Sequence, residues 1–442
     1  MAGPDVPREW LDELFDLLRI PSVSADPGHA PDVRRAAEWV CDFVRGAGGE
    51  CELVETQAQP LAVGEIRASA GAADAPTVLV YGHVDVQPPA PLRAWESPPF
   101  EPEIRGEWIY GRGVADDKGN LYLLLKAAAL LASEGALPVN VRVACDAEEE
   151  IGGHSIVDFL AEDERGADAC VIFDGGMARR DVPLFMVGTR GLVYLHVRLR
   201  TGERDLHSGI FGGAALNAVH ALVDTLRAVT EEPDELSRGI VPPTAEEVAA
   251  WDALDPGETV LADQGARPKD ARAADEFYAR TFAAAAVDVN GIAGGEPLLQ
   301  KTVLPVEAEA NVSIRLAPGQ DAEEIALAFE RILREAAPAG ADIDVERWSS
   351  APAGLVDPQA PAIRLAQDAF ERVLGVRPLL VRSGGTLPIV PALADRGIPT
   401  VLSGFDLPEG NVHSPNERLL ATYVPLGVAT ARELLAGFAA LR

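Results

Sequence analysis

Apolar residues along the chain follow two patterns, one typical of helices and one typical of strands. Several segments place apolar residues three or four positions apart, or in long runs that end near Gly or Pro, as helices that pack on a core do. Shorter, Val-rich runs between them predict buried strands. Strands that alternate with helices predict an α/β domain with a mixed, largely parallel sheet flanked by helices. The predicted helices are 8–18, 32–47, 121–134, 155–160, 214–229, 322–336, 358–374 and 423–441, and the strands are 51–56, 63–68, 77–81, 139–145 and 169–173.

The pattern changes near residue 188. Residues 192–200 and 310–318 alternate between apolar and polar side chains, as half-exposed antiparallel strands do, and a further strand is predicted at 342–348. The stretch at 231–299 is rich in Pro, Gly, Ala and acidic residues, so it predicts loops and short helices. We therefore predict a small α+β domain, inserted into a larger one. The predicted limits are 188–352 for the inserted domain and 1–187 with 353–442 for the larger domain.

Polar side chains follow the predicted strands of the larger domain. His83 and Asp85 come directly after the run at 77–81 and are two positions apart, so on an extended strand they face the same side. A carboxylate there can fix the tautomer of the imidazole, as a metal-ligating histidine requires. Ligands of such sheets bind beyond the carboxyl ends of the strands. Acids that follow the later strands are Glu149, Glu150 and Asp174.

These residues, together with Asp116 in a glycine-rich loop and His413 in a late loop, are potential metal ligands. Imidazoles and carboxylates suit zinc, manganese or cobalt. The donors are too many for one four-coordinate zinc with an open position, but they suffice for two metals that share a bridging carboxylate. Two metals can activate a water, and a carboxylate outside the metal shell must then accept its proton and pass it to a leaving amine. In the pair Glu149-Glu150, one side chain can bind metal while its neighbour acts on the water.

Composition narrows the class of partner and the compartment. The 442 residues include 38 basic and 69 acidic ones, a net charge of −31, which argues against nucleic acid or an anionic membrane as a partner. The acidic surplus is equally compatible with solubility, a salt-rich habitat or attraction of cations. Four widely spaced cysteines without a CxxC motif predict reduced thiols. With no signal-peptide pattern and no apolar run of about 18 residues, we expect a cytoplasmic protein.

Six stretches of the sequence occur in an order that is highly specific in combination: GHVD, GRGVADDKG, EEEIGG, FDGG, DLHSG and NVHSPNE. They resemble the motifs of the co-catalytic di-metal peptidase family, which includes carnosinase-like dipeptidases, aminoacylases, acetylornithine deacetylase and succinyl-diaminopimelate desuccinylase. The resemblance covers nearly the whole chain. It implies a zinc-exopeptidase-like catalytic domain, an inserted lid and dimerisation domain, a homodimer, and two divalent metal ions per subunit, with zinc favoured and manganese or cobalt as alternatives.

The same resemblance implies roles for the polar residues of the larger domain. Asp116 would bridge the two metals, and family members often have a cis peptide bond just after this residue. Glu149 would be the general base, and Asp85 would hold His83 in place. The implied ligands are His83, Asp116 and Asp174 for one metal, and Asp116, Glu150 and His413 for the other.

Residues of the inserted domain and of one later loop are implied to bind the substrate. His207, in DLHSG, resembles a residue that reaches a substrate carbonyl, commonly in the site of the partner subunit. Thr302, in KTVLP, and Arg315, in SIRLAP, match positions that bind the substrate carboxylate in the dipeptidase branch. Thr386, in RSGGTLP, resembles a contact to the substrate backbone. This chain departs from the pattern at one position: it has Ser383 where dipeptidases of this group often carry an acid.

Each motif also has an ordinary structural interpretation. A run of glutamates commonly begins a solvated helix, ADDKG ordinarily forms a turn, His207 can cap a turn, and Arg315 can face solvent. The favoured function is a dipeptidase for small peptides with a free C-terminal carboxylate. The alternative is an N-acyl-amino-acid deacylase of the acetylornithine deacetylase or desuccinylase type. A non-catalytic module is disfavoured because every expected ligand and the base are present.

Overall fold

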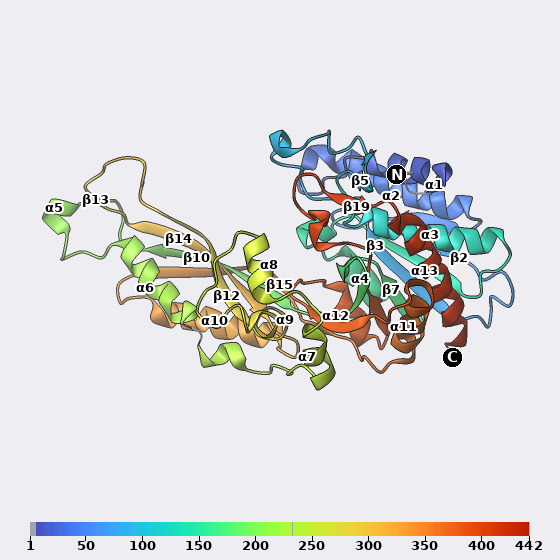
Figure 1. Ribbon diagram of the computed structural model, residues 1–442. Helices are drawn as coiled ribbons and strands as arrows, with labels where there is room; N and C mark the ends of the chain where they lie inside the picture. Colours follow the sequence, from blue (N-terminus) through green and yellow to red (C-terminus); the bar gives the residue numbers. More distant parts are fainter. Residues whose placement is uncertain (1–5, 232, 442) are drawn as a thin grey trace. The chain divides into compact units, whose positions relative to one another are not determined.

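The computed structural model describes residues 6–231 and 233–441, which form two compact units. The first unit contains the residues up to Val187, the segment Val356–Val381 and the residues from Ala392 onward. Figure 1 shows early (blue) and late (red) parts of the chain together in this unit. The second unit contains Gly188–Leu355 and Arg382–Pro391, of which the latter segment lies outside the inserted domain predicted at 188–352.

The centre of the first unit is a six-stranded sheet with the order β1-β2-β6-β3-β7-β18. The strands β6, β3, β7 and β18 are parallel to one another, whereas β1 and β2 are antiparallel at one edge. The mixed, largely parallel sheet predicted from the sequence is therefore confirmed. The strands are β1 (Glu50–Val54), β2 (Leu61–Ile66), β3 (Thr77–His83), β6 (Asn140–Asp146), β7 (Ala169–Ile172) and β18 (Thr400–Leu402).

Helices pack on this sheet through their apolar faces. Helix α2 contacts β1 and β2, α3 contacts β3, and α11 contacts β18. Helix α3 also packs against α13 and has apolar residues nearly all round, which is why most of its side chains are buried. Because α3 begins directly after Asp117, its packing on β3 positions the loop that contains Asp116. The helices are α1 (Arg8–Leu18), α2 (Ala30–Gly46), α3 (Lys118–Ser133), α4 (Ser155–Glu162), α11 (Pro361–Leu374), α12 (Ile389–Asp395) and α13 (Tyr423–Gly437).

A small antiparallel sheet brings two distant segments of the first unit together. Strand β5 (Trp108–Tyr110) pairs with β4 (Glu103–Arg105) on one side and with β19 (Arg418–Leu420) on the other. The segment that leads to Asp116 therefore lies beside the segment that follows His413. Strand β8 (Met177–Arg179) also belongs to the first unit, β9 (Val182–Thr189) and β17 (Leu379–Ser383) cross the limit between the two units, and β16 (Gly354–Leu355) belongs to the second.

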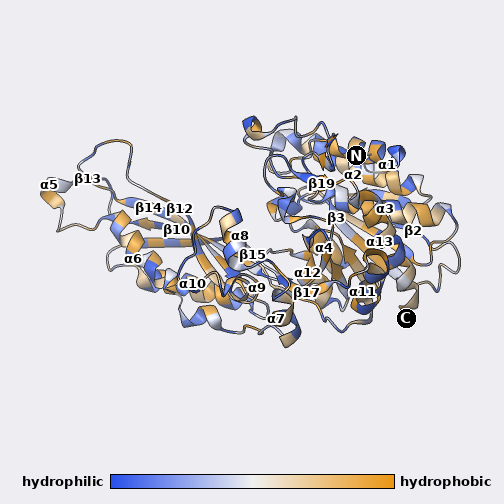
Figure 2. Ribbon diagram, in the orientation of Figure 1, coloured by the Kyte–Doolittle hydropathy of each residue, from blue (hydrophilic) through white to orange (hydrophobic). Residues whose placement is uncertain are grey.

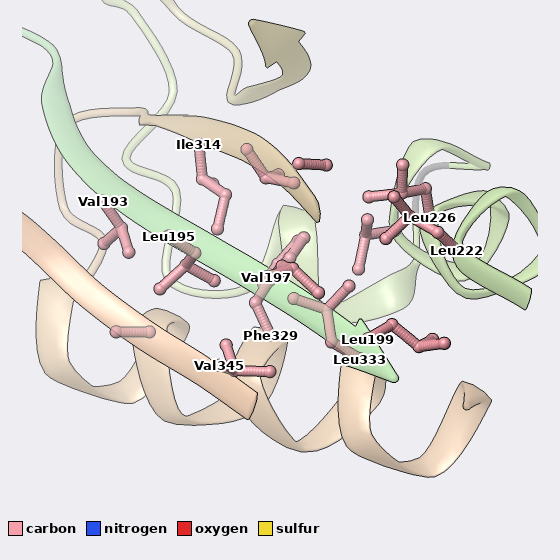
Figure 3. Close-up of a cluster of buried hydrophobic side chains, with 14 of the residues drawn as sticks. Val193, Leu195, Val197, Leu199, Leu222, Leu226, Ile314, Phe329, Leu333 and Val345 are labelled. Carbon is pink, nitrogen blue, oxygen red and sulfur yellow. The ribbon is translucent and has the colours of Figure 1, made fainter. Parts of the chain in front are cut away.

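The second unit is built on an antiparallel sheet with the order β12-β14-β10-β15. Helices α6 (Ala218–Thr230) and α10 (Ala322–Ala336) pack on it, and alternate residues of β10 are buried against them (Figure 3). Figure 2 shows apolar residues, in orange, on the strands and helices of each unit. The other elements are β10 (Gly191–Arg200), β11 (Leu206–His207), β12 (Ala286–Gly294), β13 (Val303–Leu304), β14 (Glu307–Leu316), β15 (Asp342–Ala351), α5 (Ser208–Phe211), α7 (Ala245–Trp251), α8 (Gly257–Asp263) and α9 (Phe277–Phe282).

One expectation for the second unit is wrong in part. The stretch at 231–299 does contain the short helices α7, α8 and α9, but it also contains the strand β12, which pairs with β14. This strand is mostly exposed, and its pairing shifts register between Val289 and Gly291. Only Val287 and Val289 alternate with polar residues before the glycine, which is too short a pattern to identify a strand in a sequence.

The sequence predicted reduced cysteine thiols and no membrane-spanning segment. All four cysteines are free, and three of them are buried. Within the described ranges, the helices are all too short or too polar to cross a lipid bilayer.

Candidate metal centre

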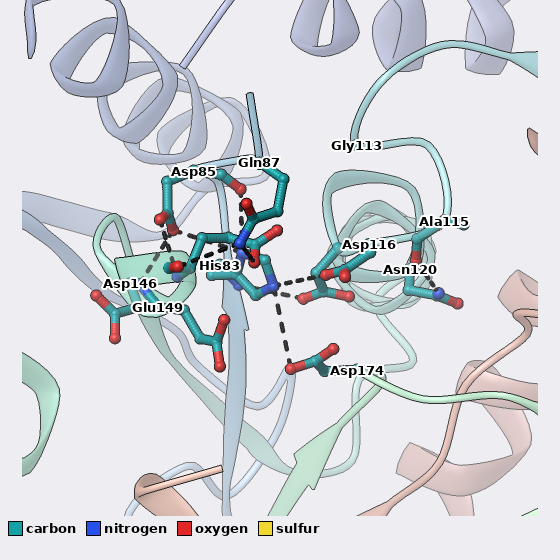
Figure 4. Close-up of polar contacts among 12 residues, drawn as sticks. His83, Asp85, Gln87, Gly113, Ala115, Asp116, Asn120, Asp146, Glu149 and Asp174 are labelled. Atoms are coloured by element: carbon teal, nitrogen blue, oxygen red, sulfur yellow. Dashed lines mark hydrogen bonds and ion pairs between the residues drawn. The ribbon is translucent and has the colours of Figure 1, made fainter. Parts of the chain in front are cut away.

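The polar residues of the strand ends meet at one edge of the central sheet. His83, the last residue of β3, is paired in register with Asp146 at the end of β6, so the turn that follows β6 lies beside it. This turn carries Glu149 and Glu150, and Asp174 follows the neighbouring strand β7. In Figure 4 the side chains of Asp116 and Asp174 point toward the His83 ring, with Glu149 on the other side of β3.

Two groups of side chains have the geometry to hold a metal ion. Within each group, the potential ligand atoms all lie within 4.8 Å of one another. In the first, the Nε2 atom of His83 lies 3.0 Å from Oδ1 of Asp116 and 4.0 Å from Oδ2 of Asp174. In the second, the Nε2 atom of His413 lies 2.9 Å from Oδ2 of Asp116 and 3.1 Å from Oε2 of Glu150.

Asp116 belongs to both groups and offers a different oxygen to each. Its Oδ1 atom faces His83, and its Oδ2 atom faces His413. A carboxylate in this position can bridge two metal ions, as co-catalytic metal pairs require. The peptide bond between Asp116 and Asp117 is cis, as the resemblance implied.

The electrostatics of this site favour cations. Burial, together with the nearby charge of Asp116, raises the pKa of Asp174 to about 7. Burial also raises the pKa of Glu149 well above its usual range. Hydrogen bonds to Asp116 and Glu150 raise the pKa of His413 to about 10. Crowded acids therefore retain protons or share them with imidazoles, and divalent metal ions are the natural replacement for those protons.

The carboxylate of Asp85 anchors the turn that carries the two glutamates. Its Oδ1 atom accepts a hydrogen bond from the backbone N–H of Glu149 at 3.2 Å, and Oδ2 accepts one from that of Glu150 at 3.1 Å. Ser24 donates a further hydrogen bond to Oδ2, at 2.6 Å. The Nδ1 atom of His83 lies 3.1 Å from the backbone oxygen of Asp85 and 3.5 Å from its carboxylate. Asp85 therefore contacts His83 mainly through its backbone.

Sequence reasoning missed several residues that hold these side chains. Gln87 donates a hydrogen bond from Nε2 to Oε2 of Glu150 at 2.9 Å. Its position could have been found, because His83, Asp85 and Gln87 are every second residue of one extended segment. Asn120 donates from Nδ2 to the backbone oxygen of Ala115 at 2.7 Å, just before Asp116. No periodicity in the sequence indicates that contact.

The predicted substrate-binding residues lie in the second unit and form two pairs. Nη1 of Arg315 donates a hydrogen bond to Oγ1 of Thr386 at 2.9 Å. His207 ends the short strand β11, which pairs with β13, and the N–H of the next residue, Ser208, donates to the backbone oxygen of Thr302 at 2.9 Å. The Nδ1 atom of His207 accepts a hydrogen bond from Gly209 N–H at 3.0 Å, so this exposed side chain does cap a turn. A role in catalysis stays a prediction for all four residues.

The fold and the paired donor groups are those of a metal-dependent hydrolase. Residues 79–437 match the family model described as Peptidase family M20/M25/M40, and the chain therefore belongs to this family. The protein is a metal-dependent peptidase.

Relatives with known activities extend this assignment. Cysteinylglycine-S-conjugate dipeptidase of Corynebacterium striatum is 29% identical over 437 residues, which cover 96% of this chain and 94% of that protein. Beta-Ala-His dipeptidase of Homo sapiens is 28% identical over 372 residues, covering 78% of this chain and 71% of that protein. A succinyl-diaminopimelate desuccinylase of Xylella fastidiosa is 31% identical over 225 residues, but that match covers only 48% of this chain and 57% of that protein. The comparisons support the dipeptidase interpretation over the deacylase alternative.

Among solved structures, an M20 family metallo-carboxypeptidase from Sulfolobus solfataricus superimposes with a TM-score of 0.87. It is 24% identical, and the match covers 98% of this chain and 99% of that one. At this level of identity, the likeness supports the fold alone.

The anchoring role of Asp85 generates a first prediction. Asp85→Asn should lower kcat/KM for peptide hydrolysis by about 10–100-fold, the usual effect of removing a group that orients metal-site residues. An amide offers one acceptor oxygen, and its NH2 group would face a backbone N–H. Steady-state kinetics should include Ser24→Ala as the control. That variant removes one hydrogen-bond partner of the Asp85 carboxylate but leaves both backbone hydrogen bonds to the turn, so its kcat/KM should fall less than that of Asp85→Asn. An Asp85→Asn enzyme with activity near that of wild type would contradict the anchoring role.

Proposed function

We propose that this protein is a di-metal dipeptidase that hydrolyses small peptides with a free C-terminal carboxylate. The observation that carries the proposal is the position of Asp116, one oxygen of which faces each of two three-residue donor groups. Glu149 lies beside both groups and belongs to neither. This arrangement fits two metals and one free carboxylate, which amide hydrolysis needs.

The proposed ligands follow from the two donor groups. His83, Asp116 and Asp174 would hold one metal, and Asp116, Glu150 and His413 the other. Imidazole nitrogen and carboxylate oxygen suit zinc best, with manganese and cobalt as alternatives. When bound, such a metal pair supplies Lewis-acid activation of the attacking water and of the substrate carbonyl.

Glu149 is the proposed general base. Asp85 holds its backbone N–H, so the start of its side chain is fixed relative to His83. Burial raises the pKa of its carboxyl group well above its usual range, and a raised pKa suits a carboxyl group that first accepts a proton and then returns it. Glu149 then accepts a proton from the attacking water and delivers it to the nitrogen of the leaving amine.

The proposed carboxylate-binding residues lie in a positively charged part of the second unit. Arg190 donates a hydrogen bond from Nε to the backbone oxygen of Gly384 at 3.1 Å, in the loop that carries Thr386. Burial, together with the nearby charge of Arg315, lowers the pKa of Arg190 to about 10, against a smaller opposing effect of Asp288. Two neighbouring guanidinium groups favour an anion, and Arg315 can bind a carboxylate in bidentate fashion.

The proposed base generates a prediction that separates chemistry from metal binding. Glu149→Gln should keep both metals but lose about 10²–10⁴-fold in kcat, because an amide cannot accept the proton of the water. Asp116→Ala should instead lose metal, because both donor groups depend on this residue. Metal analysis of the purified variants, combined with kinetics, distinguishes the two outcomes. Turnover near the wild-type level in Glu149→Gln would mean that the base is misassigned.

The proposed substrate class generates a prediction about substrate specificity. The wild-type enzyme, reconstituted with zinc, manganese or cobalt, should hydrolyse Ala- or Gly-based dipeptides and leave N-acetylamino acids intact. Arg315→Met should lower kcat/KM for the dipeptides by about 10–100-fold, mainly through KM, because hydrogen bonds to charged groups contribute about 1.5–3 kcal/mol.

The matched control for this substitution is Arg198→Met. Arg198 is an exposed arginine of the same sheet that pairs with Glu346 at 3.0 Å, and its removal should leave KM unchanged. Turnover of the acylated substrates alone would favour the deacylase alternative.

A homodimer formed through the inserted lid domain is also part of the proposal. The second unit carries exposed apolar residues, including Ile210 in α5, three positions after His207, at 70% and Leu298, in the segment before β13, at 91% relative exposure. Such side chains favour burial against a partner, and the resemblance places the corresponding histidine in the site of a partner subunit. Sedimentation velocity should give the mass of a dimer for the wild-type protein and a larger monomer fraction for Ile210→Asp. A monomeric wild-type enzyme with full activity would contradict both the dimer and the proposed role of His207.

A cytoplasmic location stays a prediction.

A further inference from the structure

A buried glutamate close to the metal centre is not used by the proposed mechanism. Glu417 follows His413 by four positions and is fully buried, at 0% relative exposure. Its Oε2 atom accepts a hydrogen bond from Nη1 of Arg112 at 2.6 Å, and Arg112 is itself 1% exposed. The carboxylate also accepts three backbone hydrogen bonds, from Gly113 N–H at 2.9 Å, Ala115 N–H at 2.9 Å and Asp116 N–H at 3.2 Å.

These contacts join two proposed metal ligands that are distant in the sequence. The backbone of Asp116 is held by the same short segment that carries His413. The side chains of these two residues approach each other to 2.9 Å. One carboxylate therefore constrains both the residue proposed to bridge the metals and the imidazole proposed to bind the second one.

The backbone around His413 needs such a constraint. Asn411, His413 and Asn416 have φ angles of 57°, 59° and 61°, which are uncommon for residues other than glycine. Conformations of this kind persist where the surrounding structure determines them. Asn416 contributes, because its side chain accepts a hydrogen bond from Glu96 N–H at 2.8 Å and donates one to the backbone oxygen of Ala94 at 2.9 Å. Glu417 anchors the next position of the same segment.

A purely structural ion pair would explain part of this arrangement, and the molecule contains one for comparison. Asp163 is half-buried, with a side chain that is 7% exposed; it pairs with Arg142 at 2.9 Å and accepts a backbone hydrogen bond from Gly166 N–H at 3.1 Å. It resembles Glu417 in its arginine partner and in its backbone contact, but it is less deeply buried. It differs because its partners are neither metal-ligand candidates nor their neighbours.

We propose that Glu417 is a positioning residue that fixes the backbone of Asp116 relative to His413 and so sets the affinity of the metal centre. The inference rests on the proposed function, because it assigns both residues as metal ligands. Removal of a group that orients metal ligands commonly lowers metal affinity by about 10–100-fold. The effect of Glu417 should therefore appear in metal binding, beyond any loss of stability.

The test compares Glu417→Gln with Asp163→Asn as the matched control. Each substitution replaces an arginine-paired carboxylate with an amide that has a single acceptor oxygen. Zinc content and zinc affinity are measured for the full chain in chelator-buffered solutions, and thermal stability is measured with and without zinc. We expect Glu417→Gln to bind at least one of the two zinc ions about 10–100-fold more weakly and to gain less stability from zinc. Asp163→Asn should also lose stability without zinc but keep the zinc affinity of the wild type.

Three results would overturn the inference. Wild-type zinc affinity in Glu417→Gln would show that the carboxylate does not position the ligands. An equal loss of affinity in Asp163→Asn would show a general effect of destabilisation. A wild-type chain that binds fewer than two zinc ions would overturn the proposed function, and this inference with it. If Glu417→Gln does not fold, Glu417→Asp takes its place, because it keeps the charge beside Arg112 but is too short for all the backbone contacts; the same loss of zinc affinity is expected.

Discussion

The structure depends on the enforced proximity of negative charges at the carboxyl edge of one sheet. Parallel strands β3, β6 and β7 end side by side, and each end delivers an acid or an imidazole to the same small volume. Carboxylates brought this close repel one another unless protons, imidazolium groups or metal ions neutralise them. The fold supplies the proximity through its backbone hydrogen bonds, and the stability of the sheet maintains it. Cation binding is thus a direct consequence of the topology.

Much of this centre could be predicted from the sequence because its signals are local. Apolar runs that end at or shortly before His83, Glu149 and Asp174 mark strand ends, and strand ends of a parallel sheet share one edge. The residues that hold the ligands were harder to find. Glu417 and Asn120 form hydrogen bonds with backbone groups of the loop that contains Asp116. Glu417 is distant from this loop in the chain, and no spacing rule in the sequence indicates either contact. The strand β12 was missed because its apolar alternation is too short: only Val287 and Val289 alternate with polar residues before Gly291, where the pairing with β14 shifts register.

In the proposed function, recognition and catalysis belong to different units of the structure. The second unit has its own core, with alternate residues of β10 buried, and the proposed metal ligands all belong to the first unit. Arg315 and Thr386 come from two different segments of the second unit and meet through a hydrogen bond. Under this proposal, the substrate-binding residues can change without disturbing the proposed metal ligands. Such a division suits a family whose relatives cleave different small peptides.

The uneven spacing of the ligands along the chain has a consequence for biosynthesis. His83, Asp116 and Asp174 lie within the first half of the sequence, so one donor group is present on the nascent chain long before synthesis ends. The second donor group is complete only when His413 has been synthesised, and the residue that anchors the backbone of Asp116, Glu417, follows four positions later. Because domains fold as units and the first unit includes β18 and α13 from the end of the chain, both proposed metal positions mature only after the last segment has left the ribosome. A chain interrupted by premature termination would lack His413 and also part of the sheet that positions the earlier donors.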